Sequence, residues 1–150
     1  MLSKRAKYAL NALLELARKA DEGPRSAASI AEAAHVPAKF LEAILLELRK
    51  AGIISSRKGR GGGHALRRDP KDISAAEVLR LFDGAIALVP CATQHYYERC
   101  EECTDEATCG VRDMFLEVRA ATVRMLKEAT IADLLVREKR LARKAARRRK

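Results

Sequence analysis

The residues with the most distinctive chemistry are four cysteines, all of which lie between positions 91 and 109 of this 150-residue chain. They are Cys91, Cys100, Cys103 and Cys109, with eight, two and five residues between neighbours. Thiols gathered in one short segment are typical of metal ligands or of redox chemistry, whereas thiols that only pack in a core are scattered. The segment therefore predicts a cysteine site of one of these two kinds.

Three kinds of chemistry are open to this spacing. Structural zinc is usually held by two close pairs of ligands, and the segment has one close pair, Cys100 and Cys103, so zinc is not favoured. Iron–sulfur clusters accept wider spacing, because two or more irons spread the thiolates. A redox pair is the third option, although the two glutamates between these thiols favour the protonated form. His95 is a further candidate ligand, or else a solvated side chain.

A second group of residues is suited to binding phosphate. The segment from Ile53 to Leu66 has an apolar entry, basic residues, four glycines within five positions and an apolar exit. Glycines permit the positive φ angles and close approaches that a tight hairpin needs. The segment predicts a two-stranded β-wing with Arg57, Lys58 and Arg60 at its tip.

The chain before this segment predicts a helix-turn-helix. Apolar residues repeat every three to four positions in 3–20 and in 38–50, and residues 26–34 predict a short helix between them. Ser3 and Ser26 are candidate N-caps. From the third helix we expect these side chains to face the core: Phe40, Leu41, Ile44, Leu45 and Leu48. A helix pair followed by a basic wing is the winged helix-turn-helix pattern.

In such a fold the second helix of the pair enters the major groove of DNA, and the wing lies along phosphates or in the minor groove. The residues predicted to contact DNA are Lys39, Glu42, Arg49, Arg57, Lys58 and Arg60, with Lys50 as a further candidate. An acid is unusual on a surface meant for phosphates. We therefore expect Glu42 to accept from a cytosine amino group or to exclude some sequences. The alternative for Glu42 is an ion pair within its own helix.

The second half of the chain predicts a connecting helix, a polar loop and a helix for self-association. Capping boxes at Ser74 and Thr130 open a helix through Phe82 and a short last helix through Leu135. The broad apolar stripe between Met114 and Leu126 indicates burial against a second copy of the chain, or else packing on the chain's own helices.

These signals divide the chain into five parts. They are a winged helix-turn-helix domain (1–70), a connecting helix (71–89), a cysteine loop (90–109), a dimerisation helix with the last short helix (110–136), and a basic tail (137–150). The tail is expected to extend the last helix or to be unstructured, with fraying at its end. The expected fold class is mainly α, with a small β-wing and a long C-terminal dimerisation helix.

Charge is unevenly distributed along the chain. Residues 1–70 hold 14 Lys and Arg against 7 acids, residues 71–136 hold 7 against 12, and residues 137–150 hold 9 against 1. A basic head and tail around an acidic middle fits a protein that places one face on phosphates. The other interpretation of each charged run is a solvated face, and it is stronger for the tail than for the head.

Several classes of protein are disfavoured. The chain has no run of eighteen apolar residues and no signal-peptide cleavage site, so we expect a cytoplasmic protein without a membrane span. Cytoplasmic cysteines are seldom structural disulfides, because the compartment keeps thiols reduced. No set of nucleophile, base and orienting residue, no phosphate-binding loop and no pair of acids suited to a cleft is present, so an enzyme is not expected.

Five segments match, in order, the pattern of one family of regulators. They are KYALNALLELA (7–17), FLEAILLELRKAGII (40–54), SRKGRGGGHAL (56–66), DISAAEVLRLFDG (72–84) and TIADLL (130–135). In these segments the chain resembles the IscR/NsrR-type winged-helix transcription regulators, the Rrf2 family. The resemblance extends to about residue 136, and the glycine-rich wing is a specific part of it. It implies a homodimer, formed by the helix after the last cysteine, and a promoter palindrome as target.

Many members of this family bind an iron–sulfur cluster through three cysteines before that helix. The resemblance carries these ligands to Cys91, Cys103 and Cys109, because the five-residue spacing before the last one is retained. The first spacing is longer, and Cys100 is additional. Where IscR-type proteins carry a ligand histidine this chain has Arg112, and where NsrR-type proteins use an aspartate it has Lys7. Cys100 is the simplest replacement for the missing fourth ligand.

The expected function is therefore that of a DNA-binding transcriptional regulator, a repressor or dual regulator. Its affinity for double-stranded DNA would depend on a [2Fe–2S] or [4Fe–4S] cluster that senses iron–sulfur, redox or nitric oxide status. One alternative is a thiol- or zinc-based regulator without a cluster. The other is a basic RNA-binding or ribosome-associated protein, in which the tail does most of the binding.

Overall fold

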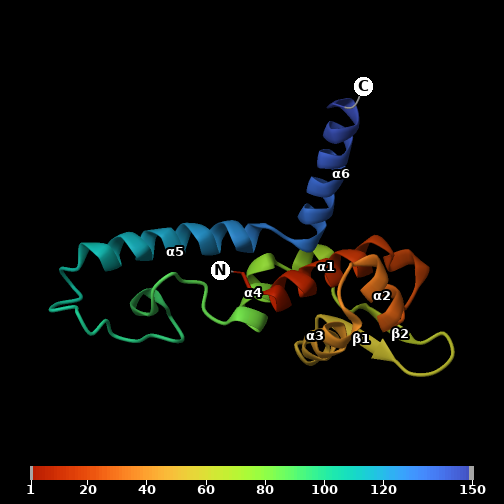
Figure 1. Cartoon of the computed structure of the whole chain (residues 1–150), viewed down its shortest axis with the longest axis horizontal. Coiled ribbons are helices and arrows are strands. Elements are labelled where there is room, and N and C mark those ends of the chain that lie inside the picture. The colour runs from red at the N-terminus through yellow and green to blue at the C-terminus, as the bar shows by residue number, and fades with distance from the viewer. Residues whose placement is uncertain (1, 149–150) are drawn as a thin grey trace.

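Six helices and one two-stranded sheet make up the computed structural model, which describes residues 2–148 (Figure 1). The helices are α1 (Lys4–Arg18), α2 (Ala27–Ala33), α3 (Ala38–Lys50), α4 (Ala75–Asp83), α5 (Gly110–Glu128) and α6 (Ile131–Arg148). The strands are β1 (Ile54–Arg57) and β2 (Gly63–Leu66), and 3₁₀ turns cover Ala20–Glu22 (η1), Pro70–Asp72 (η2) and Pro90–Ala92 (η3). The expected mainly α fold with a small β-wing is confirmed.

The helix starts follow the serine and threonine caps that the sequence predicts. Ser3 and Ser26 each accept a hydrogen bond from a backbone N–H three residues later. At Thr130 the capping box is reciprocal, because its N–H donates to the Asp133 carboxylate at 3.0 Å and its Oγ1 accepts from the Asp133 N–H at 3.1 Å. A cap of this kind stabilises a helix by about 1 kcal/mol. At Ser74 only the serine half forms, because Glu77 accepts from Arg68 instead, at 2.6 Å.

The hydrophobic core lies around α1, which packs against α3, α4 and the start of α6. Its largest fully buried side chains include Leu13, Ile30, Leu41, Ile44, Leu45, Leu48, Ile53, Ile73 and Ile131. Phe40 was expected among them, and that prediction is wrong, since its side chain is 52% exposed. Each residue of an α-helix is rotated by about 100° from the one before it, and this rotation places Phe40 at the edge of the buried stripe of α3. Its ring lies instead beside that of Tyr8, with centroids 6.3 Å apart.

The turn from α3 into the wing follows the Schellman pattern. Gly52 has a positive φ of 71°. Its N–H donates to the Arg49 carbonyl at 3.0 Å, and the Ile53 N–H donates to the Leu48 carbonyl at 3.0 Å. The chain is thereby turned into β1, which pairs with β2 in antiparallel register from Ile54 opposite Leu66 to Arg57 opposite Gly63. The predicted β-wing is confirmed.

The C-terminal helices extend away from this core. Figure 1 shows α5 running outward to the cysteine loop, which lies at the far end of the molecule from the wing. No residue of α5 is buried within the chain. Of the two expectations for the tail, extension of the last helix is the one observed: α6 continues past Leu135 to Arg148, because no glycine or proline interrupts a run of good helix formers. The expected fraying falls partly on Arg149 and Lys150, which lie outside the described residues.

None of the helices within residues 2–148 has the length and apolar character that crossing a membrane requires.

Candidate functional site

The exposed face of α3 carries the residues predicted to read DNA. Helical spacing places Lys39, Glu42, Leu46, Arg49 and Lys50 on this one face, and all five are exposed. Within the described part of the chain, only Lys50 of these five forms an ion pair, with Glu47 at 3.1 Å on the surface. Among residues 2–148 no basic side chain pairs with Glu42, so the intrahelical alternative is not formed.

A groove of about 620 Å³ separates this face from the wing. Four of the six residues predicted to contact DNA line it, namely Glu42, Arg49, Arg57 and Lys58. The structure therefore brings together residues of α3 and of the wing that are up to 16 positions apart in sequence. Lys39 and Arg60 do not line the groove; they are exposed at the start of α3 and in the loop of the wing. Phosphates on either side of a bound duplex would meet such flanking cations.

A third segment of the chain pairs with the two strands of the wing through backbone hydrogen bonds, and the sequence did not predict this pairing. Arg25, in the connection before α2, pairs with His64 of β2 through two backbone hydrogen bonds of 2.9 and 2.7 Å. The approach is close, because a Cβ at Gly63 would lie 2.5 Å from the Arg25 carbonyl oxygen. Only glycine fits there, so the wing is fixed to the helix pair by this position.

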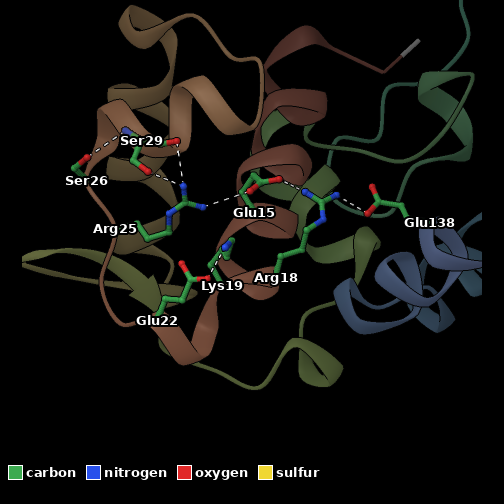
Figure 2. Close-up of polar contacts among 8 residues, drawn as sticks. All are labelled: Glu15, Arg18, Lys19, Glu22, Arg25, Ser26, Ser29 and Glu138. Atoms are coloured by element: carbon green, nitrogen blue, oxygen red, sulfur yellow. Dashed lines mark hydrogen bonds and ion pairs between the residues drawn. The ribbon is translucent and has the colours of Figure 1, made fainter. Parts of the chain in front are cut away.

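A chain of ion pairs holds Arg25 in turn (Figure 2). Its guanidinium donates to Ser29 Oγ at 2.6 Å and to Glu15 Oε2 at 3.3 Å. Glu15 is the one buried charged residue among those described, and it also pairs with Arg18, which reaches Glu138 of α6 at 2.5 Å. A signal for this network was present in the sequence, because an acid inside the apolar stripe of a helix requires a cationic partner.

His64 of β2 is another residue that the sequence analysis did not identify as part of the site. Its Nδ1 lies 2.8 Å from Ser56 Oγ across the two strands. Burial, and to a smaller extent the positive charge of Arg49, lower the pKa of His64 below its usual 6.5. The imidazole is therefore neutral at pH 7, and it adds a hydrogen-bonding edge rather than a charge to the groove.

All four cysteines line one hollow of about 460 Å³, between the turn η3 and the start of α5. Cys109 caps α5, and its Sγ accepts a hydrogen bond from the Arg112 N–H at 3.4 Å. The Arg112 side chain donates from Nε to the Cys91 carbonyl at 3.1 Å. These contacts join the two ends of the cysteine loop, so its first and last thiols face the same hollow.

The thiols differ in their acidity. The backbone N–H of Arg112 is the main cause that lowers the pKa of Cys109. Burial raises the pKa of Cys103, and a 3.1 Å hydrogen bond to Glu102 raises that of Cys100. Of these three thiols, Cys109 at the N-terminus of α5 thus most readily becomes a thiolate, which is the form that binds metals.

The other candidate ligands lie elsewhere. His95 lines a separate hollow with Arg80 and Arg119, and Lys7 is an exposed residue of α1. Within the described part of the chain, no three His, Cys, Asp or Glu side chains converge closely enough to hold a single metal ion. The four thiols share one hollow without meeting at one point.

Comparisons with known proteins agree with this architecture. The model of the Rrf2 family, described as iron-dependent transcriptional regulators, matches residues 2–137. An rrf2-like HTH-type transcriptional regulator of Rhodobacter capsulatus is 43% identical over 138 residues, which cover 90% of this chain and 92% of that protein.

Two solved structures have a similar fold. One is CymR, the global cysteine regulator of B. subtilis, with a TM-score of 0.75 and 31% identity over 91% of this chain and 96% of its own. The other is IscR of T. potens, with a TM-score of 0.72 and 27% identity over 92% of this chain and 88% of its own. The family model covers nearly the whole chain, and the fold, the wing and the helix pair are shared. The protein therefore belongs to the Rrf2 family of transcriptional regulators.

Proposed function

We propose that this protein is a homodimeric repressor that binds a palindromic promoter site and responds to an iron–sulfur cluster held in the cysteine loop. The observation that carries the DNA-binding part is the groove between α3 and the wing, which gathers Glu42, Arg49, Arg57 and Lys58. An exposed helix with both cationic and acidic side chains, next to a basic hairpin, suits the major groove and its flanking phosphates.

The dimer is supported by α5. Its exposed apolar residues Val111, Met114, Val118 and Met125 recur at intervals of three, four and seven, which is the spacing of a seam between two packed helices. An unpartnered seam of this kind is a typical dimer contact. A two-fold axis through it relates two α3 helices, and such a pair reads two inverted half-sites.

The cluster is supported by the number and placement of the thiols. Cys91, Cys100, Cys103 and Cys109 would hold it, and Arg112 beside them would offset its negative charge. When bound, a cluster exchanges electrons and reacts with oxidants, which gives a regulator its signal. The similarity to an IscR and the family's iron-dependent description are in keeping with this proposal.

A regulator that senses through its thiols, without a cluster, is the second candidate. It is favoured by the lowered pKa of Cys109 and by the likeness to CymR, the cysteine regulator. Purification without oxygen separates the two. Brown protein with acid-labile sulfide and about four iron or two iron atoms per protomer supports the cluster. Colourless protein that regulates DNA binding through reversible thiol oxidation would overturn it.

The DNA-binding part has its own test. Binding sites are selected from a randomised duplex library with the wild type and with Glu42→Ala, Lys58→Ala and Arg60→Ala. Glu42→Ala should change which bases are selected, because it removes an acceptor from a base-reading face. The two wing variants should weaken binding to all selected sites and keep the same preference. Identical base preferences for Glu42→Ala and the wild type would exclude a base-reading role for Glu42.

Repression is tested by transcription in vitro from a promoter that carries the selected palindrome. Added dimer should lower transcript yield if the site overlaps the polymerase position, and an increase would show activation instead.

A further inference from the structure

The last helix leaves the body of the protein on the side away from the recognition surface. Its first turns are packed, with Ile131 buried and Leu134 and Leu135 against the core. From residue 136 to residue 148 every residue is exposed. Figure 1 shows α6 projecting from the body in the direction opposite to α3 and the wing. Any ligand of its outer half is therefore separate from DNA bound by the same protomer's α3.

This projecting helix is strongly and one-sidedly basic. The described part of α6 holds seven Lys and Arg against two acids. Both acids are already engaged, Asp133 in the capping box and Glu138 with Arg18. Five of the cations line a single shallow hollow along the helix: Lys139, Arg140, Arg143, Lys144 and Arg147. Within residues 2–148 no acid forms an ion pair with any of these five.

The sequence of the helix is unfavourable unless this charge is neutralised. Like charges recur at i and i+4 in four successive pairs between Lys139 and Arg148, which destabilises an isolated helix. No packing against the body offsets this repulsion, since the segment is exposed throughout. A polyanion that lies along the basic face would remove it.

The chemistry of the face selects among polyanions. Five of the seven cations of α6 are arginines, three of them on this face, and their planar guanidinium groups pair with phosphate through two hydrogen bonds. The opposite face offers Leu141 and three alanines, too little apolar surface to insert into a lipid bilayer. A single helix also fits the width of the major groove of duplex DNA.

We propose that the outer half of α6 binds the phosphates of double-stranded DNA, on a segment other than the one read by α3 and the wing. The dimer then joins two DNA segments, an operator on its recognition side and a second duplex on the α6 side. The choice of DNA among polyanions rests on the proposed function, which already brings the protein to DNA. The basic surface of α6 is observed independently of that proposed function.

Recruitment of a second duplex tests this inference. Full-length dimer is saturated with a fluorescent operator duplex and passed over beads that carry an unrelated duplex, and operator retained on the beads is measured. The charge variant carries Arg140→Gln, Arg143→Gln, Lys144→Gln and Arg147→Gln. The matched control carries Ala142→Gln and Ala145→Gln on the opposite face of α6, and leaves the charge unchanged.

Wild type and control should retain the operator, and the charge variant should lose most of that retention. The log–log salt slope of retention should fall by about 3 to 4, since each phosphate contact contributes roughly 0.9. Operator affinity in solution should stay within about twofold. Loss of operator affinity in parallel with retention would place α6 on the same duplex and overturn the inference.

Two further measurements test whether RNA or a lipid surface is the partner of α6 instead. Stronger competition by an RNA of equal length than by the duplex, or capture on vesicles with anionic lipid but not on DNA beads, would overturn the inference. If the wild type binds no operator, the proposed function fails. In that case the protein retained on the DNA beads is measured instead of the operator. Loss of this retention in the charge variant but not in the control would still support DNA binding by α6.

Discussion

Arg112 occupies the position at which IscR-type relatives are expected to carry a ligand histidine. A guanidinium stays protonated and has no lone pair to give to a metal. Its observed role is to tie the start of α5 to the carbonyl of Cys91 at 3.1 Å, which brings the two ends of the cysteine loop together. The fourth ligand of the proposed cluster would then come from another residue. Cys100 lines the cysteine hollow, and His95 does not.

This difference gives a prediction about ligand choice. Cys91→Ala, Cys103→Ala and Cys109→Ala should each prevent stable cluster binding, because each leaves too few thiolates. Cys100→Ala should lower cluster stability far more than His95→Ala. Each variant is reconstituted without oxygen, and iron and sulfide are counted per dimer. A full, stable cluster in Cys100→Ala together with its loss in His95→Ala would assign the fourth ligand to His95.

His64 gives a prediction about pH. Because burial and Arg49 hold its pKa below 6.5 in the folded protein, the unfolded chain binds more protons between that lowered pKa and 6.5. The contribution of His64 to stability is therefore lost as the pH falls through this window, and is constant above it. His64→Gln should reduce the fall in the free energy of unfolding below about pH 6.5. Urea denaturation across this range measures it, and parallel curves for both proteins would contradict it.

Elements with local signals could be predicted from the sequence, and those that depend on distant contacts could not. The caps at Ser3, Ser26 and Thr130 and the turn at Gly52 are set by residues within a few positions, and all form as expected. The pairing of Arg25 with the wing joins segments about 40 residues apart, and no local pattern encodes it. Local signals thus fix each helix and the hairpin, while the wing's anchoring depends on tertiary packing.

The same limit applies to the candidate site. Clustered thiols predicted a cysteine site, and the four do line one hollow. The separation of His95 from them follows from the path of the loop, which spacing does not determine. The error at Phe40 has a similar cause, since helical period identifies a face but not where its edge meets a neighbour.

The anchoring of the wing is testable at the scale of elements. Glu15→Gln and Arg25→Gln should each lower the free energy of unfolding by about 1–3 kcal/mol, because each leaves a poorly solvated charge without its partner. The double variant should cost less than the sum of the two. Both singles should also weaken operator binding beyond what lost folding explains, since the wing would no longer be held beside α3.

Chemical denaturation and operator titration measure these effects. Glu138→Gln is the control, because it removes the exposed pair with Arg18 at the edge of the network and leaves both arginine partners of Glu15 in place. Additive destabilisation by the two variants, or unchanged operator affinity in the folded variants, would show that the ion pair does not position the wing.

At the scale of the whole molecule, the cysteine loop and the wing lie at opposite ends of one chain (Figure 1). The element that leaves the cysteine loop is α5, which begins at Gly110 with Cys109 as its N-cap and carries the exposed apolar seam. A change in the loop therefore reaches the start of the seam before it reaches any residue that we propose to contact DNA. In a dimer the seam sets the distance between the two α3 helices, and half-site spacing is strict in this class of protein.

Disrupting the seam should accordingly separate folding from DNA binding. Met114→Glu with Val118→Glu places two like charges from each protomer against each other, and should convert the dimer to a monomer. Neither side chain is buried within the chain, so the monomer should keep its helix content and thermal stability apart from the contribution of association. Its affinity for the palindrome should fall by at least about tenfold, because the second half-site no longer adds to the binding energy.

Ala120→Glu, exposed on α5 but off the seam, is the matched control and should remain dimeric. Sedimentation equilibrium and operator titration together measure these outcomes. If the double variant remains a dimer with full operator affinity, α5 is not the dimer contact, and coupling between the cysteine loop and the DNA must follow another route.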